Sequence, residues 1–363
     1  MILNSGIGNY VYSNGNKYSY FGGNNYLGLA NHPSVREAAI KAVEKYGVNF
    51  SASRHTTGTA DIHLELEKAL AVFKGQEDAV VFASGYQGNS ILLEILKGSY
   101  STIFIDQSAH ASIIAAIPAD AVKVMYYDHC DASHLENLLD HNKGSYPLII
   151  TDGIFALTGE IAPLDEIYPV VKKHNGILVV DDAHSTGVLG ATGKGTPEHF
   201  KLHGKERIFQ TETMSKALGG YGGFISGTKD LTEMVRERSA TYQASTALPP
   251  PIAASGIASL KIIREHPELR TQLLDKAGKL RAEIARQGFH TTHFDTPIIP
   301  IILDRPEKAR SLSSYLEENG MIAPFINYPV RQELHIIRIA VSFSHTDDQL
   351  GALLELLKKW KEK

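Results

Sequence analysis

The sequence predicts an α/β fold built on a mostly parallel seven-stranded sheet, with a smaller α+β domain toward the C-terminus. Seven short apolar runs alternate with helical segments between residues 79 and 226, a rhythm typical of right-handed βαβ units. The run at residues 177–180 (Ile-Leu-Val-Val) is apolar at every position, as expected for a parallel strand buried on both faces. The 363 residues also suffice for one large domain and a smaller one.

The first part of the chain is expected to hold one strand and two helices. Residues 18–21 (Tyr-Ser-Tyr-Phe) suit an edge strand. A helix is predicted over residues 33–46, because Pro33 suits the first turn of a helix. After a loop at 47–60, the spacing of the apolar residues in 62–73 predicts a second helix.

Seven strands form the predicted sheet. They are expected at residues 79–83, 102–106, 122–127, 148–151, 177–180, 208–211 and 223–226. Beyond the prolines at 249–251, the sequence predicts a helical stretch to about 287 that is interrupted near Pro267, a strand at 298–303, a helix at 306–319, a strand at 336–342 and a terminal helix from Asp347. The expected domains are an N-terminal segment at 1–30 that packs with the small domain, a large domain at 31–250 and the small domain at 251–363.

The composition restricts the partners and the compartment. With 36 Lys and Arg against 40 Asp and Glu, the formal net charge is −4, so no basic surface for nucleic acid or an anionic membrane is expected. Cys130 is the only cysteine, which excludes an intrachain disulfide and a multi-cysteine metal site. The N-terminus lacks the segments of a signal peptide, and no apolar run reaches membrane-spanning length. A cytoplasmic protein is therefore expected.

One lysine is notable because of its place at the end of a predicted strand. Lys216 follows the hydroxyl residues Thr213 and Ser215 and precedes a glycine pair at 219–220. A lysine that loses its hydration at a strand end has a lowered pKa and can form a Schiff base as a nucleophile. Taken alone, such a lysine is more often a solvated surface residue. The residues upstream change this interpretation.

Two acids and a histidine follow the buried run at 177–180. Asp181, Asp182 and His184 lie at the carboxyl end of that strand, where open α/β sheets bind their ligands. A carboxylate there suits the ring nitrogen of pyridoxal phosphate (PLP), whose aldehyde would take Lys216. The alternatives are a solvated acid in a turn, or a metal site formed by Asp181, Asp182 and His184.

Other polar residues also follow predicted strands. Ser84, Gly85 and Tyr86 form a glycine turn into a helix, which suits a phosphate but is equally common as a plain connection. The Thr213 hydroxyl suits a phosphate or the local backbone. His110 is placed to stack on an aromatic ring, although a hydrogen-bonded turn histidine is the commoner case.

Arg338 is a charged residue inside the apolar segment 335–341. Its planar guanidinium suits a carboxylate ligand. A structural ion pair is the competing interpretation, because an unpaired buried arginine is costly. The glycines at 187–195 have the wrong spacing for a phosphate loop, and the sequence contains neither G-x-S-x-G nor H-E-x-x-H. A P-loop nucleotidase and a serine hydrolase are therefore not favoured.

Together, these segments resemble the α-oxoamine synthases, fold-type I PLP-dependent enzymes that include 2-amino-3-oxobutyrate CoA ligase, 8-amino-7-oxononanoate synthase, serine palmitoyltransferase and 5-aminolevulinate synthase. The resemblance extends from about residue 24 to the C-terminus. Its motifs are N-N-Y-L-G-L at 24–29, S-G-Y at 84–86, H-A-S at 110–112, T-D-G-I-F at 151–155, V-D-D-A-H at 180–184, T-M-S-K at 213–216 and S-T-A-L-P-P at 245–250. Each motif is modest alone, but together and in this order they are highly specific.

The resemblance implies a role for each matching residue. Lys216 would form the Schiff base with PLP and later act as the base at the amino-acid Cα. Asp181 would pair with the ring nitrogen, His110 would stack on the ring, and His184 would contact the 3-hydroxyl.

The resemblance also implies residues for the phosphate and for the substrate carboxylate. The phosphate would be bound by Ser84, Gly85, Tyr86 and Thr213, with Ser245 and Thr246 reaching it from the neighbouring subunit of an obligate homodimer. Asn24 and Arg338 would bind the carboxylate of the amino acid. No metal is implied.

The implied reaction condenses a small α-amino acid with an acyl-CoA to give an aminoketone, usually with loss of CO2. An aminotransferase or an aldol-type lyase on the same fold is the alternative. A third possibility is a non-catalytic regulatory subunit, against which the presence of Lys216 argues.

Two features depart from the family pattern. The family commonly reads F-S-M-D-G where this chain has F-A-L-T-G at 155–159, so Ala156 lacks a hydroxyl expected near the cofactor or substrate. The segment before Asn24 also looks shorter than usual. The exact reaction and the acyl donor therefore do not follow from the resemblance.

Overall fold

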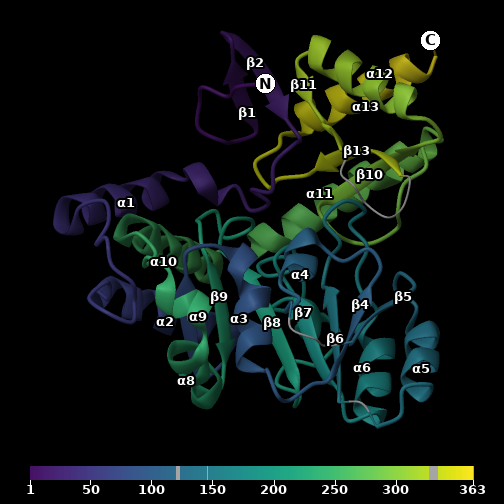
Figure 1. The fold of residues 1–363 in the computed structure, drawn as a ribbon. Coiled ribbons are helices and arrows are strands. Elements are labelled where there is room, and N and C mark those ends of the chain that lie inside the picture. The colour runs from purple at the N-terminus through teal and green to yellow at the C-terminus, as the bar shows by residue number, and fades with distance from the viewer. Residues whose placement is uncertain (120–122, 145, 327–333, 363) are drawn as a thin grey trace.

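A mostly parallel seven-stranded sheet forms the lower part of the molecule in Figure 1 and confirms the predicted fold class. The structure is a computed structural model that describes residues 1–119, 123–144, 146–326 and 334–362. The strand order is β3-β9-β8-β7-β6-β4-β5. The strands are β3 (Asp78–Phe82), β4 (Thr102–Asp106), β5 (Lys123–Tyr127), β6 (Pro147–Asp152), β7 (Ile177–Asp181), β8 (Ile208–Thr213) and β9 (Gly223–Gly227). All seven match predicted strands, although Val122, the first residue of one prediction, lies outside the described residues.

Helices cover both faces of this sheet, which explains why its central strands are apolar throughout. Every residue of β6 and β7 is buried. One face packs against α3 (Gly88–Ile95) and α8 (Lys229–Arg238). The other face packs against α5 (Ala132–Asp140) and α6 (Leu164–Lys173). Only β9 runs antiparallel to its neighbours, so the other strands end at one common edge.

Two long helices near the N-terminus pack against a third helix that follows the large sheet in the sequence. Helix α1 (Pro33–Tyr46) and helix α2 (Asp61–Lys74) both pack against α10 (Pro250–Glu265). The break predicted near Pro267 separates α10 from α11 (Glu268–Arg286). Helix α11 runs upward to the second part of the molecule, which contains the two small sheets described below (Figure 1). The remaining short helices of the large sheet are α4 (Ala111–Ala115), α7 (Thr196–His199) and α9 (Ala240–Ala244).

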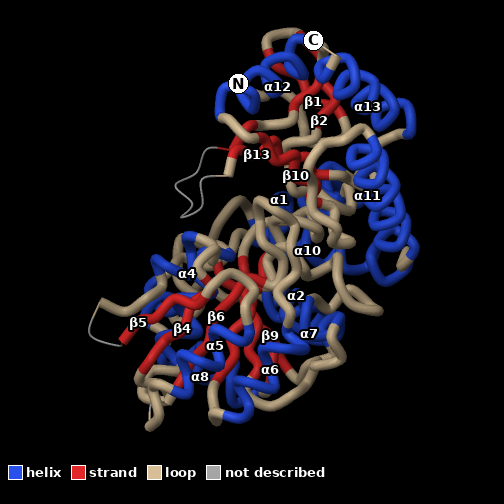
Figure 2. Tube along the Cα trace, turned by 90° about the vertical axis from the view of Figure 1, so that its right-hand side faces the viewer, coloured by secondary structure: helices blue, strands red, loops and turns tan. Residues whose placement is uncertain are grey.

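The second part of the molecule, which is the upper part in Figure 1, contains two small sheets and both described ends of the chain (Figures 1 and 2). One sheet has the order β1-β2-β11 and the other has the order β10-β13-β12. Their strands are β1 (Tyr10–Ser13), β2 (Asn16–Tyr20), β10 (Ile298–Leu303), β11 (Met321–Ile322), β12 (Phe325–Ile326) and β13 (His335–Ala340), with the helices α12 (Pro306–Glu318) and α13 (Asp347–Lys361). The division of the chain at residues 30 and 250 stays a prediction.

Strand β1 was not predicted, although the turn after it carries a recognisable signal. Asn14 and Gly15 connect β1 to β2 and both have positive φ, 50° and 79°. An Asn-Gly pair favours the tight turn of a hairpin. In the described part of the chain, no helix is both long and apolar enough to cross a membrane.

A buried ion pair joins helix α2 to strand β8 beneath the carboxyl edge of the sheet. Lys74 and Glu212 are 0% and 1% exposed, and the Lys74 ammonium contacts both the Glu212 carboxylate and the Lys194 carbonyl. The Glu212 carboxylate also accepts hydrogen bonds from Thr186 and Ser226, both at 3.1 Å. Burial raises the pKa of Glu212, and the charge of Lys74 opposes that rise.

Replacing Lys74 with methionine should therefore leave a buried carboxylate without its counter-charge. We expect the free energy of unfolding to fall by about 3–5 kcal/mol, measured by urea denaturation followed by circular dichroism. Lys68→Met, at an exposed position of the same helix, is the control and should change it by less than about 0.5 kcal/mol. Equal stability of the two variants would contradict the expectation.

Candidate active site

The Asp181 carboxylate is held by side chains from two other elements at the carboxyl end of β7. Its Oδ2 accepts a hydrogen bond from Asn89 Nδ2 at 2.7 Å and lies 3.4 Å from Ser112 Oγ. The Asn89 side chain is fully buried, and its Oδ1 accepts from Thr211 Oγ1 at 3.0 Å. That bond directs the amide nitrogen of Asn89 toward Asp181. The carboxylate is therefore fixed in position while 7% of the residue stays exposed.

Asp182 belongs to a different environment, so the alternative of a metal site is not supported. Its carboxylate is fully buried and accepts hydrogen bonds from Thr196 and Gln210. Among the described residues, Asp181, Asp182 and His184 do not form a group whose ligand atoms could share one ion. Asp181 and Asp182 instead bind separate partners.

The Lys216 amine lies beyond the end of β8, near the carboxylates of the site. Burial lowers the pKa of Lys216, and the charge of Arg338 adds to this effect, whereas Asp181 and Asp152 oppose it. The amine has no hydrogen bond to any residue that the structure describes. A lowered pKa increases the fraction of neutral amine, which is the nucleophilic form.

Asp152 ends β6 and stands in register with Asp181 on β7. The residue is 3% exposed, and burial together with the nearby charge of Asp181 raises its pKa well above the usual value. Its Oδ2 accepts the backbone N–H of His110 at 2.9 Å. Asp152 thereby fixes the loop that carries His110.

The His110 ring lies at the start of α4 with an exposed position in the site. Its Nδ1 is 2.8 Å from Ser112 Oγ. Burial of part of the ring and the charge of Lys216 lower its pKa, with Asp181 opposing. A neutral imidazole at an exposed position of the site is suited to stacking on a flat ring.

A buried tyrosine connects His184 with Arg338. The Tyr26 hydroxyl lies 2.7 Å from His184 Nδ1 and 3.2 Å from an Arg338 nitrogen. Burial raises the pKa of Tyr26. Burial and the charge of Lys216 together place the pKa of His184 well below its usual value. Arg338 donates to the tyrosine oxygen, and the phenol has both Asn24 Oδ1, at 3.3 Å, and His184 Nδ1 within reach. When the phenol donates to Nδ1 of a neutral His184, the proton of that histidine resides on Nε2.

Arg338 is a buried cation with neutral partners. It is 6% exposed and donates from Nε to the Ala156 carbonyl at 2.6 Å and from a terminal nitrogen to Asn24 Oδ1 at 2.8 Å. No carboxylate of the described residues pairs with it, so the structural ion pair is not supported there. The guanidinium remains available to an acidic ligand. At Ala156, whose side chain has no hydroxyl, this chain contributes its backbone carbonyl.

The phosphate residues proposed from sequence form a small cradle beside β8. A Cβ added to Gly85 would lie 2.7 Å from Thr213 Cβ and 2.8 Å from its hydroxyl, so only glycine allows this approach. Ser84 Oγ accepts from the Tyr86 backbone N–H at 3.3 Å, and the Tyr86 side chain is 52% exposed. Thr213 Oγ1 lies 2.8 Å from Ser215 Oγ. The cradle therefore presents hydroxyls and a helical N-terminus.

Ser245 and Thr246 lie at different places relative to this cradle. Ser245 Oγ accepts from Gln87 Nε2 at 2.9 Å, and Gln87 belongs to the same turn as Gly85. Thr246 is exposed and pairs with Ser53 through an isolated bridge. The structure of one chain thus brings Ser245, rather than Thr246, next to the phosphate turn.

Sequence reasoning missed three residues of the site. They are Tyr26, Asn89 and Asp152, all at most 3% exposed. Tyr26 lies inside the motif at 24–29, and Asn89 follows the predicted phosphate turn. Asp152 is the acid at the end of the strand next to β7, so a comparison of neighbouring strand ends would have found it.

Comparison with known proteins agrees with this arrangement. The family model for aminotransferase class I and II matches residues 17–357. The 8-amino-7-oxononanoate synthase of Alkaliphilus metalliredigens is 40% identical over 349 residues, which cover 95% of this chain and 88% of that protein. A solved serine palmitoyltransferase from S. paucimobilis with bound PLP superposes with a TM-score of 0.92 at 28% identity, covering 97% of this chain and 89% of that one. An 8-amino-7-oxononanoate synthase from Francisella tularensis gives 0.81 at 27% identity, covering 94% and 97%.

The chain therefore belongs to the aminotransferase class I and II family of fold-type I PLP-dependent enzymes. Within that family it is an α-oxoamine synthase, an acyltransferase that condenses an amino acid with an acyl thioester. These relatives favour acyl transfer over the alternatives of an aminotransferase or a lyase.

The residues of the site fit the PLP on which this family depends. Gly85 packs directly against Thr213, since an added Cβ would lie 2.7 Å from Thr213 Cβ, and this contact brings the turn beside the Thr213 hydroxyl. Lys216 offers an amine with a lowered pKa, and Asp181 offers a fixed carboxylate oxygen. A phosphate, an aldehyde and a ring nitrogen are the three groups of PLP that need such partners.

Replacing Asn89 with leucine should weaken PLP binding. The substitution removes the hydrogen bond from the Asn89 side chain that fixes Asp181, while the volume of the side chain changes little. We expect the dissociation constant for PLP to rise about 10- to 100-fold, the usual worth of a hydrogen bond to a charged group. Titrating the cofactor-free protein by absorbance measures it. Asn137→Leu, at an exposed position of α5, is the control. Unchanged affinity in Asn89→Leu would show that Asp181 needs no such support.

Proposed function

We propose that this enzyme condenses alanine with a thioester of a seven-carbon dicarboxylic acid and releases CO2. The similarity to 8-amino-7-oxononanoate synthases supports this proposal. Their product is a nine-carbon acid with a ketone at C7 and an amine at C8. Dividing it between C7 and C8 leaves a seven-carbon acyl group and a CH(NH2)CH3 unit. Alanine supplies that unit when its carboxyl group leaves as CO2.

Four side chains would act on the cofactor and the reacting carbon. When bound, PLP supplies an electron-withdrawing ring that stores the charge developed at the amino-acid Cα. Asp181 would keep the ring nitrogen protonated, and His110 would cover one face of the ring. Lys216, as a neutral amine, would take the Cα proton. His184, with its proton on Nε2, would donate to the 3-hydroxyl oxygen.

Arg338 and Asn24 would bind the carboxylate of the amino acid. Arg338 Nε and one terminal nitrogen already donate to Ala156, Asn24 and Tyr26. Within the described residues this leaves the other terminal nitrogen, with two N–H groups, to donate to the carboxylate. The buried position excludes water, so this bond is stronger than it would be at the surface.

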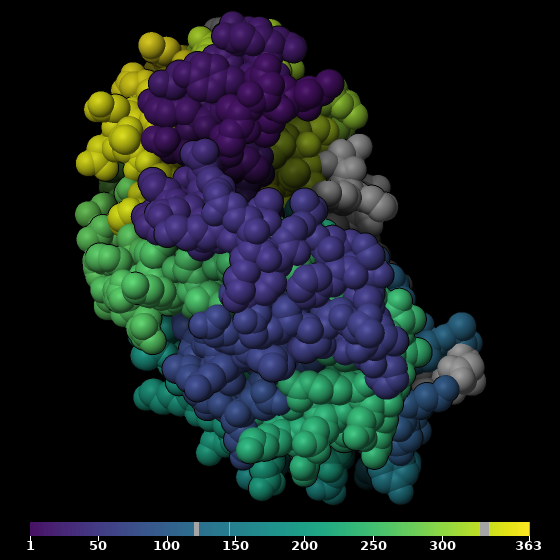
Figure 3. Space-filling view, turned by 90° about the vertical axis from the view of Figure 1, so that its left-hand side faces the viewer, coloured from purple at the N-terminus to yellow at the C-terminus, as the bar shows by residue number. Residues whose placement is uncertain are grey.

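The phosphate would be bound by the turn of Ser84, Gly85 and Tyr86 and by the Thr213 hydroxyl. We further propose that the enzyme is a cytoplasmic homodimer in which Thr246 approaches the phosphate of the partner, while Ser245 stands beside the phosphate turn of its own chain. Exposed apolar side chains on α1, α2 and the adjoining loop support a second copy as the partner. They are Ile40, Val43, Val48, Leu64 and Val72, each 44–72% exposed, and Figure 3 shows the face on which these helices lie. Apolar groupings of this kind are typical of subunit interfaces.

Release of free thiol from a panel of acyl-CoAs tests the choice of substrates. Alanine with a seven-carbon dicarboxylic thioester should release thiol at least about 10-fold faster than glycine, because one methyl group in a fitted pocket gives discrimination of this size. Serine and 2-aminobutyrate complete the panel. The control omits the amino acid. Faster release with a long unbranched acyl chain would contradict the proposed donor.

Replacing Arg338 with alanine should weaken alanine binding about 10- to 100-fold while PLP stays bound, because only the substrate loses a charged hydrogen-bond partner. Spectral titration of the PLP-loaded protein with alanine gives both quantities. Arg338→Lys keeps the charge without the planar guanidinium and should recover only part of the lost alanine affinity. Unfolding of both variants would assign Arg338 a structural role instead.

A further inference from the structure

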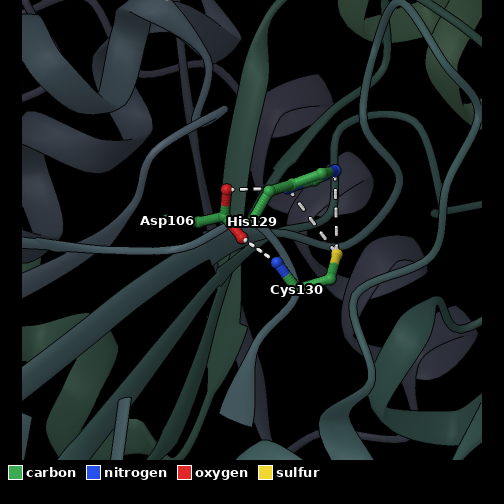
Figure 4. Close-up of side chains that lie close together, drawn as sticks. All are labelled: Asp106, His129 and Cys130. Carbon is green, nitrogen blue, oxygen red and sulfur yellow. Dashed lines mark hydrogen bonds and ion pairs between the residues drawn. The ribbon is translucent and has the colours of Figure 1, made fainter. Parts of the chain in front are cut away.

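A histidine outside the proposed reaction lies between two carboxylates at the edge of the sheet. His129 follows β5, and its Nδ1 is 2.9 Å from Asp106 Oδ1. Its Nε2 is 3.1 Å from Glu160 Oε2. The ring also meets the Phe155 ring edge-on, with 4.3 Å between centroids. Figure 4 shows His129 with Asp106 on one side and Cys130 on the other.

Bonds to carboxylates at both ring nitrogens require that both nitrogens carry protons. The ring is therefore an imidazolium. Burial opposes this charge, but hydrogen bonds with Asp106, Cys130 and Glu160 raise the pKa of His129 to about 12. Asp106, His129 and Cys130 lie near enough to one another to suggest a metal site. A ring whose two nitrogens both donate has no lone pair for a metal, so this cluster is an ionic contact.

The Asp106 end of this contact is fixed to the large sheet. Asp106 ends β4, and its carboxylate also accepts backbone N–H groups from Ser108 at 2.8 Å and from Cys130 at 2.9 Å. The residue is fully buried. His129 is therefore attached to a rigid support on this side.

The Glu160 end belongs to the turn at 155–160, which contacts the second part of the molecule. Three of its carbonyls accept hydrogen bonds from that part: Ala156 from Arg338 Nε at 2.6 Å, Thr158 from Thr292 Oγ1 at 2.9 Å and Gly159 from Thr296 Oγ1 at 2.9 Å. A Cβ on Gly159, whose φ is +69°, would approach the Ile298 carbonyl to 2.5 Å. The turn thus lies directly against β10.

We propose that His129 is a positioning residue for amino-acid recognition. As a cation held by Asp106 and Glu160, it anchors the turn at 155–160 to the large sheet, and the Ala156 carbonyl then orients the Arg338 guanidinium. This inference rests on the proposed role of Arg338 in carboxylate binding. It explains how a backbone carbonyl suffices at Ala156: the ionic contact fixes the segment that carries it.

The competing possibility is that Thr292 and Thr296 hold the turn without His129. Both donate to carbonyls of the turn from the second part of the molecule, so they fix it to β10 but not to β4. Removing the imidazolium should then change nothing at Arg338. The two possibilities therefore predict different affinities for the amino acid.

The test uses His129→Gln and Glu160→Gln in the full chain loaded with PLP, with alanine as the probe and no acyl donor. His129→Gln should raise the dissociation constant for alanine about 10-fold, with that for PLP within about 2-fold of the unmodified protein. Glu160→Gln keeps an acceptor for Nε2 and should raise the alanine constant less, which keeps the test informative should the first variant fold poorly. His141→Gln, an exposed histidine at the end of α5, is the control.

Alanine affinity equal to that of the control in both variants would overturn the role of His129, as would a parallel loss of PLP affinity. Arg338→Ala is measured in the same experiment to separate the two levels of the proposal. If Arg338→Ala leaves alanine binding unchanged, the proposed carboxylate site is wrong. If it weakens binding while His129→Gln does not, only the positioning role is wrong.

Discussion

The site depends on two carboxylates that stand side by side at the ends of neighbouring parallel strands. Asp152 and Asp181 are register partners on β6 and β7, and both are largely buried. Two such charges repel each other strongly where water is excluded. The surrounding groups relieve this repulsion in different ways: Asn89 donates to Asp181, the His110 backbone donates to Asp152, and the Lys216 amine lies close to both. The sheet therefore creates the electrostatic environment that a cationic ring would enter.

Much of the fold and the centre of the site were predictable from sequence, because parallel strands carry a strong local signal. Continuous apolar runs defined the seven strands, and the polar residues immediately after them included Asp181 and Lys216. Contacts between distant segments carry no such signal. Tyr26 bonds His184 and Arg338, residues more than 150 positions away, and nothing in its local sequence distinguishes it from a core tyrosine. The partners of Arg338 are a carbonyl, an amide and a phenol, and only packing reveals them.

The roles of the predicted residues differ in how firmly the geometry supports them. Lys216, Asp181, His110, His184 and Arg338 are connected by contacts or by the effect of their charges on one another. The phosphate turn and Thr213 are in direct contact through Gly85. Thr246, in contrast, lies on an exposed segment beside Ser53, where a second chain rather than this one would give it a function.

The pairing of early and late segments has a consequence for synthesis of the protein. The Phe21 N–H donates to the Ile322 carbonyl, and the Phe21 carbonyl accepts from the Ala340 N–H at 2.8 Å. The Tyr26 carbonyl accepts from the Phe343 N–H at 2.7 Å. The segment that carries Asn24 and Tyr26 leaves the ribosome first, but these backbone partners between residues 322 and 343 emerge last. The large sheet can assemble earlier during translation, since domains fold as units. The proposed carboxylate site is thus completed last, and an interrupted chain would contain Lys216 without Arg338 beside Asn24 and Tyr26.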